Sequence, residues 1–586
     1  MANEFDGVDY AFFAATLLLS TAIGVFYAVM DRKRQNTGEV FLGGGSMPII
    51  PTALSLVTSF VSGISILGVP ADVYRRGILM WWSRLFGTAV AILLGLFVVV
   101  PIFYNMDPKP VSIYDYLERR FHSKVVKFMG IAIFLLFMVF YMGIVLYAPS
   151  VALSAGTSVP AWVFFISVGL VCTLYTTLGG LKAVVWTDTL QACIMIVGLL
   201  TLVFKGIVDS GGFHHTFSLS STYHRYAGIN LWDPNFFQYN TIWTASLGGM
   251  GLWMSALTFN QISVQRYLSL PTLKRSKTMV ALNIPGYALM CTLCDVLGIV
   301  MFAYYFGCDP IHAKKIRGHD QLVIHFALDV LGSIPGMPGL FLAMLFSGTL
   351  STISSGINSM AAVTFEDFLK PCLGHKSQRT QTVVAKILTF TYGLLGIMLS
   401  FIAGPMGGML EATLGILGVL AGPLIGAFLL GIFVPQANYV GAIVGMLTSG
   451  ILLIWVGLGS AMLKPYKSFE LPLFTDKCTN ISHNFDYLSA SNYTGDYDIY
   501  GANPLTGYRY IYGMSPSFYP FLGGLLTLII GTLVSLCVRR QVEKRQLKKV
   551  DLSLTVVGLW RKETPAEKTD LSSDSGFGFK RRESQF

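Results

Sequence analysis

Charged residues are scarce in this sequence. Only 12% of its 586 positions are Asp, Glu, Lys or Arg, whereas 53% are hydrophobic. Soluble globular chains carry about 25% charged residues. The shortage of charge excludes a series of soluble domains, and the mean hydropathy of +0.61 indicates a polytopic membrane protein.

A continuous basic surface is also missing, although the formal net charge is +10. The basic residues lie between apolar segments and in the C-terminal tail, which is where membrane topology requires them. We therefore expect no nucleic-acid partner.

The N-terminus lacks the marks of a cleaved signal peptide. It carries Glu4, Asp6 and Asp9, with no basic n-region and no small-residue cleavage site. The first apolar segment is therefore expected to be retained as a membrane anchor.

The sequence also lacks motifs for a disulfide framework, a metal site or a catalytic site. Eight cysteines in a chain of this length do not form a disulfide framework. The CxxC of Cys291 and Cys294 has neither a second pair nor a histidine to complete a metal site. Because no catalytic constellation appears, we expect neither an enzyme nor a bound cofactor.

Long apolar segments, by contrast, are abundant. Segments of about twenty residues are long enough to cross a bilayer as helices, and they predict an all-α protein with thirteen membrane spans. Their approximate ranges are 10–30, 47–69, 79–104, 127–150, 161–178, 187–206, 241–259, 279–306, 337–364, 383–403, 410–433, 438–461 and 516–538.

The distribution of charge predicts the orientation. With the N-terminus outside, most of the 41 Lys and Arg residues fall in inside loops and in a cytoplasmic C-terminal tail of a plasma-membrane protein. Two glycosylation sequons, at Asn480 and Asn492, fall in the loop after span twelve, which this topology places outside. Cys308 and Cys478 also fall in outside loops and could pair.

The stretch 338–367 combines an apolar background with a polar stripe. Hydroxyl and amide side chains recur there at spacings of three and four, which places them on one helical face: Ser347, Ser351, Ser354, Ser355 and Asn358. Polar groups at membrane depth face protein or a water-filled cavity, and oxygen ligands without a full carboxylate suit sodium. The alternative is close helix packing, which also favours small and hydroxyl residues.

Two spans carry small-residue interruptions. Span two contains Ser62-Gly63 with Gly68, and span seven contains Gly248-Gly249 with Gly251. Their places in the order of spans make them enter the membrane from opposite sides, as broken helices do in two inverted halves of a transporter. An unwound segment frees backbone carbonyls for a cation and helix N-termini for an anion. Glycines that serve packing alone are the alternative.

Four stretches stand out together. They read SLVTSFVSGISILGVPADVYRRG (55–77), GGLKAVVWTDTLQ (179–191), NQISVQRYLSLPTLKRSK (260–277) and SGTLSTISSGINSMAAVTFEDF (347–368). Together they resemble the solute:sodium symporter family. LGVPADVYRRG, and FGCDP before span nine, are similar to its branch of sodium-coupled monocarboxylate, multivitamin and iodide transporters. The likeness runs in order from about residue 8 to 540.

The resemblance implies a division of the chain. Spans two to eleven would form a leucine-transporter-like inverted repeat of five plus five spans with broken helices. The divisions are an extra span with the first cytoplasmic loop (1–40), the first repeat with an outside loop (41–240), the second repeat (241–437), spans twelve and thirteen with the glycosylated loop (438–538), and the tail (539–586).

The resemblance also implies a sodium site, with sodium as the only metal. Carried over by position, it would use the hydroxyls of Ser351 and Thr352 and the backbone carbonyls of Gly348, Thr58 and Val61. In another part of the chain, Asp188 resembles the acidic residue near the family's cytoplasmic sodium exit path. Its alternative role is to cap the N-terminus of an inside helix.

By the same resemblance, the substrate would lie between spans two, three and seven. The candidate residues are Ser62, Ser65, Leu67, Trp82, Arg84, Trp243 and Trp253. A tryptophan in an apolar span can equally serve packing.

Arg84 lies inside span three, where an unpaired charge costs at least about 2.5 kcal/mol. Its guanidinium can receive a substrate carboxylate through two parallel hydrogen bonds. The alternative is that it snorkels to the outer interface with Arg75 and Arg76. Asp295 is a second intramembrane charge, outside the recognised family pattern, which can pair with a basic group or titrate.

These features predict secondary active symport, in which sodium entering down its gradient drives a small organic anion, foremost a monocarboxylate, inward. A multivitamin-type substrate such as biotin or pantothenate, and an iodide-type substrate, are the alternatives within the class. A sodium-gated sensor or channel on the same fold is an alternative of a different class, which sequence alone does not separate.

The tail has its own content. The basic run 539–549 is expected to lie on anionic membrane lipid, and the segment 563–586 is expected to be disordered. The final Glu583-Ser584-Gln585-Phe586 matches the carboxyl-terminal pattern that a PDZ domain captures, although chance matches are frequent.

Overall fold

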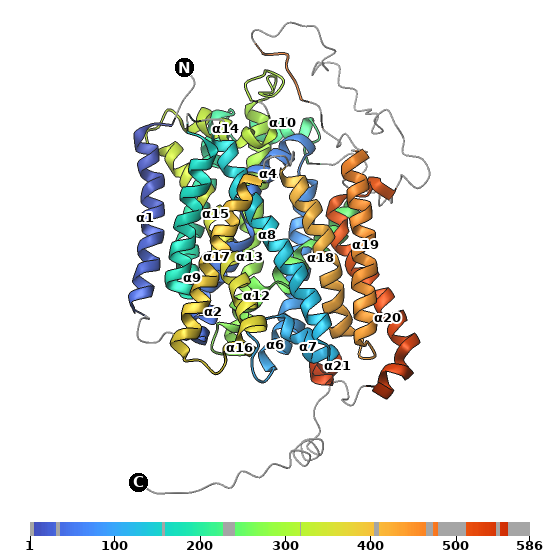
Figure 1. The fold of residues 1–586 in the computed structure, drawn as a ribbon. Coiled ribbons are helices and arrows are strands. Elements are labelled where there is room, and N and C mark those ends of the chain that lie inside the picture. The colour runs from blue at the N-terminus through green and yellow to red at the C-terminus, as the bar shows by residue number, and fades with distance from the viewer. Residues whose placement is uncertain are drawn as a thin grey trace.

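The computed structural model describes residues 5–30, 36–154, 157, 159–226, 241–316, 318–402, 409–463, 471, 473–478, 511–545 and 551–560. Within these ranges every regular element is a helix and no strand occurs, so the all-α prediction is confirmed. Figure 1 shows the long helices running side by side through one bundle.

The helices fall into long and short elements. The long ones are α1 (Gly7–Met30), α5 (Leu79–Leu94), α8 (Lys124–Ser154), α9 (Ala161–Asp209), α13 (Leu273–Tyr304), α15 (Met337–Thr364), α17 (Gln378–Ile402), α18 (Met409–Phe433), α19 (Tyr439–Leu463) and α20 (Tyr519–Arg545). The shorter ones are α2 (Thr37–Leu42), α3 (Ile49–Phe60), α4 (Gly63–Arg76), α6 (Val100–Asn105), α7 (Tyr114–Phe121), α10 (Phe213–Thr222), α11 (Ile242–Trp253), α12 (Gln261–Leu268), α14 (Leu322–Leu331), α16 (Lys370–Leu373) and α21 (Val556–Trp560).

The number of membrane spans depends on whether bent or interrupted helices are counted as one span or two. Among the described residues, nine helices are long and apolar enough to cross a membrane, or ten if the bent pair Thr37–Gly45 and Ile49–Phe60 counts as one span. Two predicted spans, 161–178 and 187–206, lie in the single element α9, which kinks at Gly180 (φ 59°, ψ −155°). Predicted span two is divided between α3 and α4, and predicted span seven forms the shorter helix α11 with the π-helical turn that follows it. The count of thirteen and the inverted repeat therefore stay predictions.

Predicted span two is broken where its small residues lie. Helix α3 ends at Phe60, Val61 and Ser62 leave the helical conformation (ψ 89° and 171°), and α4 begins at Gly63. A Cβ atom at Gly63 would lie 2.5 Å from Thr349 Oγ1. The absence of a side chain therefore lets the start of α4 approach α15 closely.

The predicted break of span seven at its glycines is wrong. Gly248, Gly249 and Gly251 all lie inside α11, which continues through a π-helical turn (Met254–Thr258) and ends at Phe259 and Asn260. These glycines serve close packing instead. A Cβ atom at Gly249 would lie 2.5 Å from the backbone oxygen of Ser83, and neighbouring helices crowd the other two glycines in the same way.

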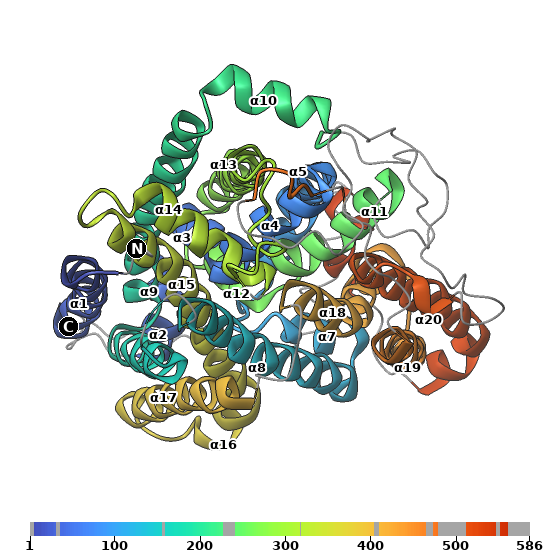
Figure 2. The ribbon, with the colours of Figure 1, turned by 90° about the horizontal axis from the view of Figure 1, so that it is seen from above.

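Helix α15, which carries the polar stripe, lies in the interior. Figure 2 shows α8, α9 and α17 around it, and α1 packs against it as well. Asp9 of α1 accepts a hydrogen bond from the backbone N–H of Gly339 at 2.8 Å. Because the first N–H groups of a helix have no partner within it, this carboxylate anchors α1 to the start of α15.

The connecting segments gather at two ends of the bundle. Helices α10 and α14, from loops expected outside, lie at one end, and α7, α16 and α21, from segments expected inside, lie at the other (Figure 1). Cys308 and Cys478 are joined by a disulfide, with Cα atoms 4.9 Å apart. The sequons at Asn480 and Asn492 and the terminal residues 583–586 lie outside the described residues.

Candidate functional site

Two of the residues expected to bind sodium, Ser351 and Thr58, are in contact beside the break between α3 and α4. Ser351 Oγ on α15 donates to the carbonyl oxygen of Thr58 on α3 at 2.6 Å. Thr352 Oγ1 donates to the Gly348 carbonyl at 3.0 Å, and Val61 is the C-cap residue that follows α3. The side chains of Thr58, Ser351 and Thr352 are fully buried, and that of Val61 is nearly so.

The close contact of α15 with the break depends on Gly348. A Cβ atom at this position would lie 3.1 Å from the backbone N of Gly63 and from the backbone C of Ser62. Carbonyl groups at the end of α3 have no partner in the next helical turn and carry partial negative charge. Together with two hydroxyls they offer hard oxygen ligands without a carboxylate, which suits a monovalent cation.

A buried polar cluster joins α3, α9, α12 and α15. Arg266 on α12 donates to Ser59 Oγ at 2.8 Å, to Ser355 Oγ at 2.6 Å and to Asp188 Oδ2 at 3.1 Å. Its Nε donates to Ser55 Oγ at 2.9 Å, and Ser55 in turn donates to Asp188 at 2.5 Å. We call these five residues the Arg266 cluster.

Asp188 does not begin a helix. It lies inside α9, well beyond the kink at Gly180, so the alternative that it caps a helix N-terminus is wrong. Its second oxygen, Oδ1, is buried and has no hydrogen-bond partner among the described residues. An unpaired buried charge is costly, and the ion pair with Arg266 offsets the cost of burying the Asp188 carboxylate.

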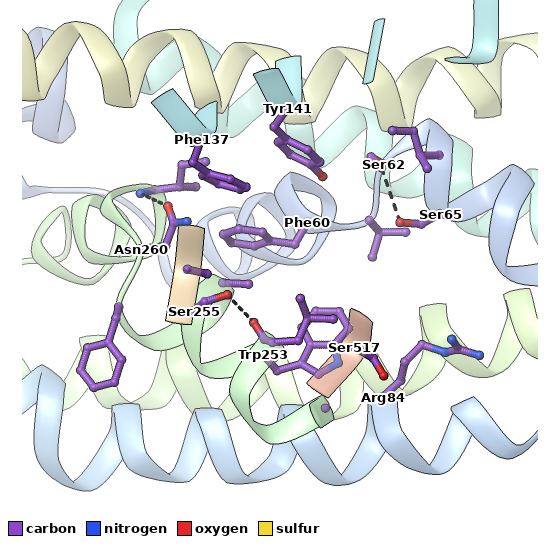
Figure 3. Close-up of a pocket in the computed structure, with 18 of the residues that line it drawn as sticks. Phe60, Ser62, Ser65, Arg84, Phe137, Tyr141, Trp253, Ser255, Asn260 and Ser517 are labelled. Carbon is purple, nitrogen blue, oxygen red and sulfur yellow. Dashed lines mark hydrogen bonds between the residues drawn. The ribbon is translucent and has the colours of Figure 1, made fainter. Parts of the chain in front are cut away.

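A cavity of about 190 Å³ opens beside the break, between α4, α5, α8, α11, α13 and α18. Its walls are mainly aromatic and aliphatic. Figure 3 shows Phe60, Tyr141 and Trp253 along its length, with Ser65 and Arg84 at one end and Asn260 at the other. A mostly apolar cavity with a few polar groups is the usual form of a site for a small organic molecule.

The predicted substrate residues divide into two sets. Ser62, Ser65, Arg84 and Trp253 line the cavity. Leu67 is buried away from it, and Trp82 and Trp243 are exposed by 44% and 43% on the outside of the helices. The structure therefore does not bring Leu67, Trp82 or Trp243 to the cavity.

Several lining residues were missed from the sequence. Asn260 follows the break after α11, and its side chain accepts a hydrogen bond from Ile262 N at 2.9 Å as an N-cap. Asparagine is a favoured N-cap residue, so this signal was available. Phe60, Phe137 and Tyr141 carried no such signal, because an apolar helix does not reveal which aromatic side chains face a cavity.

Arg84 does not snorkel to the interface with Arg75 and Arg76. Its Nε donates to Asp295 Oδ2 on α13 at 3.1 Å, and Nη2 forms an ion pair with Oδ1. Arg84 is 14% exposed and lines the cavity, whereas Asp295 has no exposed surface and lies behind it. Asp295 therefore fixes the plane of the guanidinium from the protein side.

Transition-metal chemistry has no support in the described part of the chain. No group of three or more His, Cys, Asp or Glu side chains there is arranged to hold a metal ion. Cys291 and Cys294 are buried free thiols that line the cavity.

The sequence model of the sodium:solute symporter family matches residues 40–449. The chain belongs to this family. It is therefore a sodium-coupled membrane transporter by family and not an enzyme, and nothing in the family or its relatives indicates a cofactor.

Curated relatives cover most of the chain. Sodium-coupled monocarboxylate transporter 1 of Mus musculus is 37% identical over 90% of this chain and 86% of its own length. Sodium-coupled monocarboxylate transporter 2 of Homo sapiens is 36% identical over 91% and 84%. The sodium-dependent multivitamin transporter of Oryctolagus cuniculus is 40% identical over 78% and 72%.

The fold has a counterpart among solved structures. A Na+-coupled sialic acid symporter in its substrate-bound outward-open state superposes with a TM-score of 0.73, covering 91% of this chain and 98% of that one. The sequence identity is 21%, so this likeness shows the fold alone.

Proposed function

We propose that this protein is a plasma-membrane symporter in which sodium, moving down its gradient, drives a small monocarboxylate into the cell. The N-terminus would lie outside and the C-terminus in the cytoplasm. The observation that carries the proposal is the contact of Ser351 on α15 with the Thr58 carbonyl beside the break between α3 and α4, next to a cavity that Arg84 lines.

Sodium would bind between the hydroxyls of Ser351 and Thr352 and the backbone carbonyls of Gly348, Thr58 and Val61. In the structure the Ser351 hydroxyl donates a hydrogen bond to the Thr58 carbonyl at 2.6 Å. A bound cation would replace that hydrogen bond, since both oxygens can then turn their lone pairs to the ion. The ion would hold α3 against α15 and so favour one arrangement of the broken helix.

The substrate carboxylate would bind to Arg84, with the apolar body between Phe60, Tyr141 and Trp253. Sodium and substrate would lie on two sides of the same break, since Val61 and Ser62 line the cavity while Thr58 contacts Ser351. Each ligand would stabilise the same conformation, so binding of one raises the affinity for the other by the same factor.

A multivitamin-type carboxylate is a second candidate. The cavity continues from Arg84 past the aromatic side chains to Asn260, which offers a polar contact at the far end (Figure 3). A longer acid with a distal polar group would use both ends, and one relative is a multivitamin transporter.

The test is uptake of radiolabelled lactate, pyruvate, biotin and iodide into cells that express the chain, in sodium and with choline in its place. We expect one carboxylate to accumulate above its outside concentration only with sodium. The double substitution Ser351→Ala/Thr352→Ala should abolish this accumulation.

A matched control removes two hydroxyls elsewhere. Thr201 is half-buried and Thr391 is exposed, and each donates to the carbonyl four residues earlier. Thr201→Ala/Thr391→Ala should leave uptake unchanged. If the protein reaches the surface and no substrate accumulates, symport of these anions is wrong. Sodium-dependent currents without accumulation would instead support a sensor or channel.

A further inference from the structure

The charged groups at one end of the cavity form two pairs. Arg84 on α5 pairs with Asp295 on α13, and Arg76 pairs with Asp72 within α4, with a shortest distance of 2.6 Å. Asp72 lines the cavity, as Arg84 does. These two carboxylates balance the two guanidinium groups, so the four residues together carry no net formal charge.

The geometry of the Arg84 pair leaves room for a second carboxylate. A guanidinium has five N–H groups in a planar fork. Asp295 uses the edge formed by Nε and Nη2. Among the residues that the structure describes, no other side chain or carbonyl binds Arg84, so the edge formed by Nη1 and Nη2 is available to the cavity.

We infer that Asp295 is a positioning and specificity residue that restricts this site to monoanions. It holds the guanidinium with one edge toward the cavity, and its own negative charge cancels that of Arg84. A substrate with one carboxylate then adds a single negative charge, which one sodium ion balances. A dicarboxylate adds a second negative charge in a mostly apolar cavity, where nothing balances it.

Neutralising Asp295 should therefore widen specificity. In Asp295→Asn the amide keeps the size of the side chain and can still accept a hydrogen bond from Arg84, but the cavity gains one net positive charge. The inference rests on the proposed function, because it assumes that Arg84 receives a carboxylate. Repulsion between Asp295 and the second carboxylate of a dianion is lost in this variant. The affinity for a dicarboxylate should therefore rise by about tenfold or more.

The experiment compares three four-carbon probes on the purified full-length protein in sodium. Butyrate is a monoanion, succinate is a dianion at neutral pH, and succinamate has the shape of succinate with one charge. Binding is measured by the intrinsic tryptophan fluorescence of the protein and by thermal shift, and uptake of the same probes is measured in cells. The wild type should bind butyrate and succinamate and reject succinate, which separates charge from shape without any substitution.

Substitutions then test whether the charge of Asp295 causes the discrimination against succinate. Asp295→Asn should raise the affinity for succinate about tenfold relative to butyrate, and Asp295→Glu should keep the wild-type discrimination. Asp72 also lines the cavity, but it is paired with Arg76. Asp72→Asn should therefore change the ratio less than Asp295→Asn, which leaves the full charge of Arg84 to the substrate. Asp209→Asn should change nothing, because Asp209 forms an exposed pair with Lys205.

Four results would overturn the inference. They are wild-type binding of succinate as tight as that of butyrate, an unchanged ratio in Asp295→Asn, equal effects of Asp295→Asn and Asp72→Asn, or no binding of any probe. The proposed function fails separately: if the probes bind with the expected ratios but none is taken up with sodium, symport is wrong and the role of Asp295 in binding stands.

Discussion

Arg266 Nη2 lies 3.1 Å from Asp188 Oδ2, and neither side chain exposes more than 1% of its surface. The two residues lie on α12 and α9, and the three serines of the Arg266 cluster bring α3 and α15 into the same hydrogen-bond network. This pair therefore ties the broken helix to the helix that carries the polar stripe.

Removing the arginine should destabilise the fold strongly. Arg266→Ala leaves the Asp188 carboxylate buried and unpaired, which typically costs about 3–5 kcal/mol. Lys205→Ala breaks a pair that is exposed by 32% and 27%, and exposed pairs contribute about 0–1 kcal/mol. Thermal unfolding of both variants in detergent measures the difference. An Arg266→Ala protein as stable as Lys205→Ala would contradict the role given to this pair.

Trp253 should matter for substrate, whereas two other tryptophans should not. Its Nε1 is buried beside the cavity and has no hydrogen-bond partner among the described residues, so a substrate oxygen can accept from it. Losing one hydrogen bond in Trp253→Phe should raise the substrate KM by roughly three- to tenfold.

Trp82→Phe and Trp243→Phe serve as its controls. Both tryptophans are exposed away from the cavity, and Trp82 Nε1 donates to Ser246 Oγ at 3.1 Å. Concentration-dependent uptake at saturating sodium should show unchanged KM values for both. Equal effects in all three variants would remove Trp253 from the site.

Gly249 should not tolerate a side chain. A Cβ atom there would lie 2.4 Å from Ser83 Oγ and 2.5 Å from the Ser83 carbonyl oxygen, so α11 would have to move away from α5. We expect Gly249→Ala to cost about 1–3 kcal/mol of stability. In Gly450→Ala the added atom would lie 3.7 Å from Pro423 Cγ, an ordinary contact, and helix propensity should then add up to about 1 kcal/mol. Opposite shifts in the unfolding temperature are the expected result.

Asp309, in the loop after α13, should make stability depend on acid pH. Burial alone would raise its pKa, but hydrogen bonds from His312 and from the Tyr74 hydroxyl hold the pKa below its ordinary value. His312 Nδ1 lies 2.6 Å from Oδ2, and Tyr74 donates to Oδ1 at 2.7 Å. Because the pKa is lower in the folded state, the charged carboxylate stabilises the fold above the unfolded pKa of about 3.9. This contribution is lost as the pH falls through the folded pKa.

Asp309→Asn tests this sign. At neutral pH the variant should unfold at a lower temperature than the wild type, and the difference should shrink below about pH 4. Unfolding temperatures of the purified protein between about pH 3 and pH 7 measure it. A difference that does not change with pH would show that packing, and not the charge of Asp309, is responsible.

The break in span two could be predicted from the local sequence. Ser62 and Gly63 interrupt an apolar segment, and the helix does end there because Gly63 lets α4 approach α15. The same reasoning failed in span seven. Glycine lowers the cost of leaving a helix, but it also lowers the distance at which two helices can pack, and only the neighbours decide between these effects.

The partners of charged side chains in the spans could not be predicted from the sequence. The sequence showed that Arg84 and Asp295 are unusual at membrane depth, but not that they bind each other across 211 positions. The predicted spans leave Arg266 in the loop between spans seven and eight, and no sequence pattern pairs it with Asp188. A charge in an apolar setting predicts that a partner exists, since an unpaired one is too costly, and nothing in a linear pattern names that partner.

The sequence by itself determined the membrane class, the all-helical fold, the family and the polar face of α15, because composition, helical spacing and short motifs are local properties of the chain. Only the tertiary structure decided which face of each helix lines the cavity, which carboxylate holds each arginine, and where span seven breaks. The physical reason is that these features arise from contacts between helices, and such contacts depend on the shape and charge of residues that are distant in the sequence.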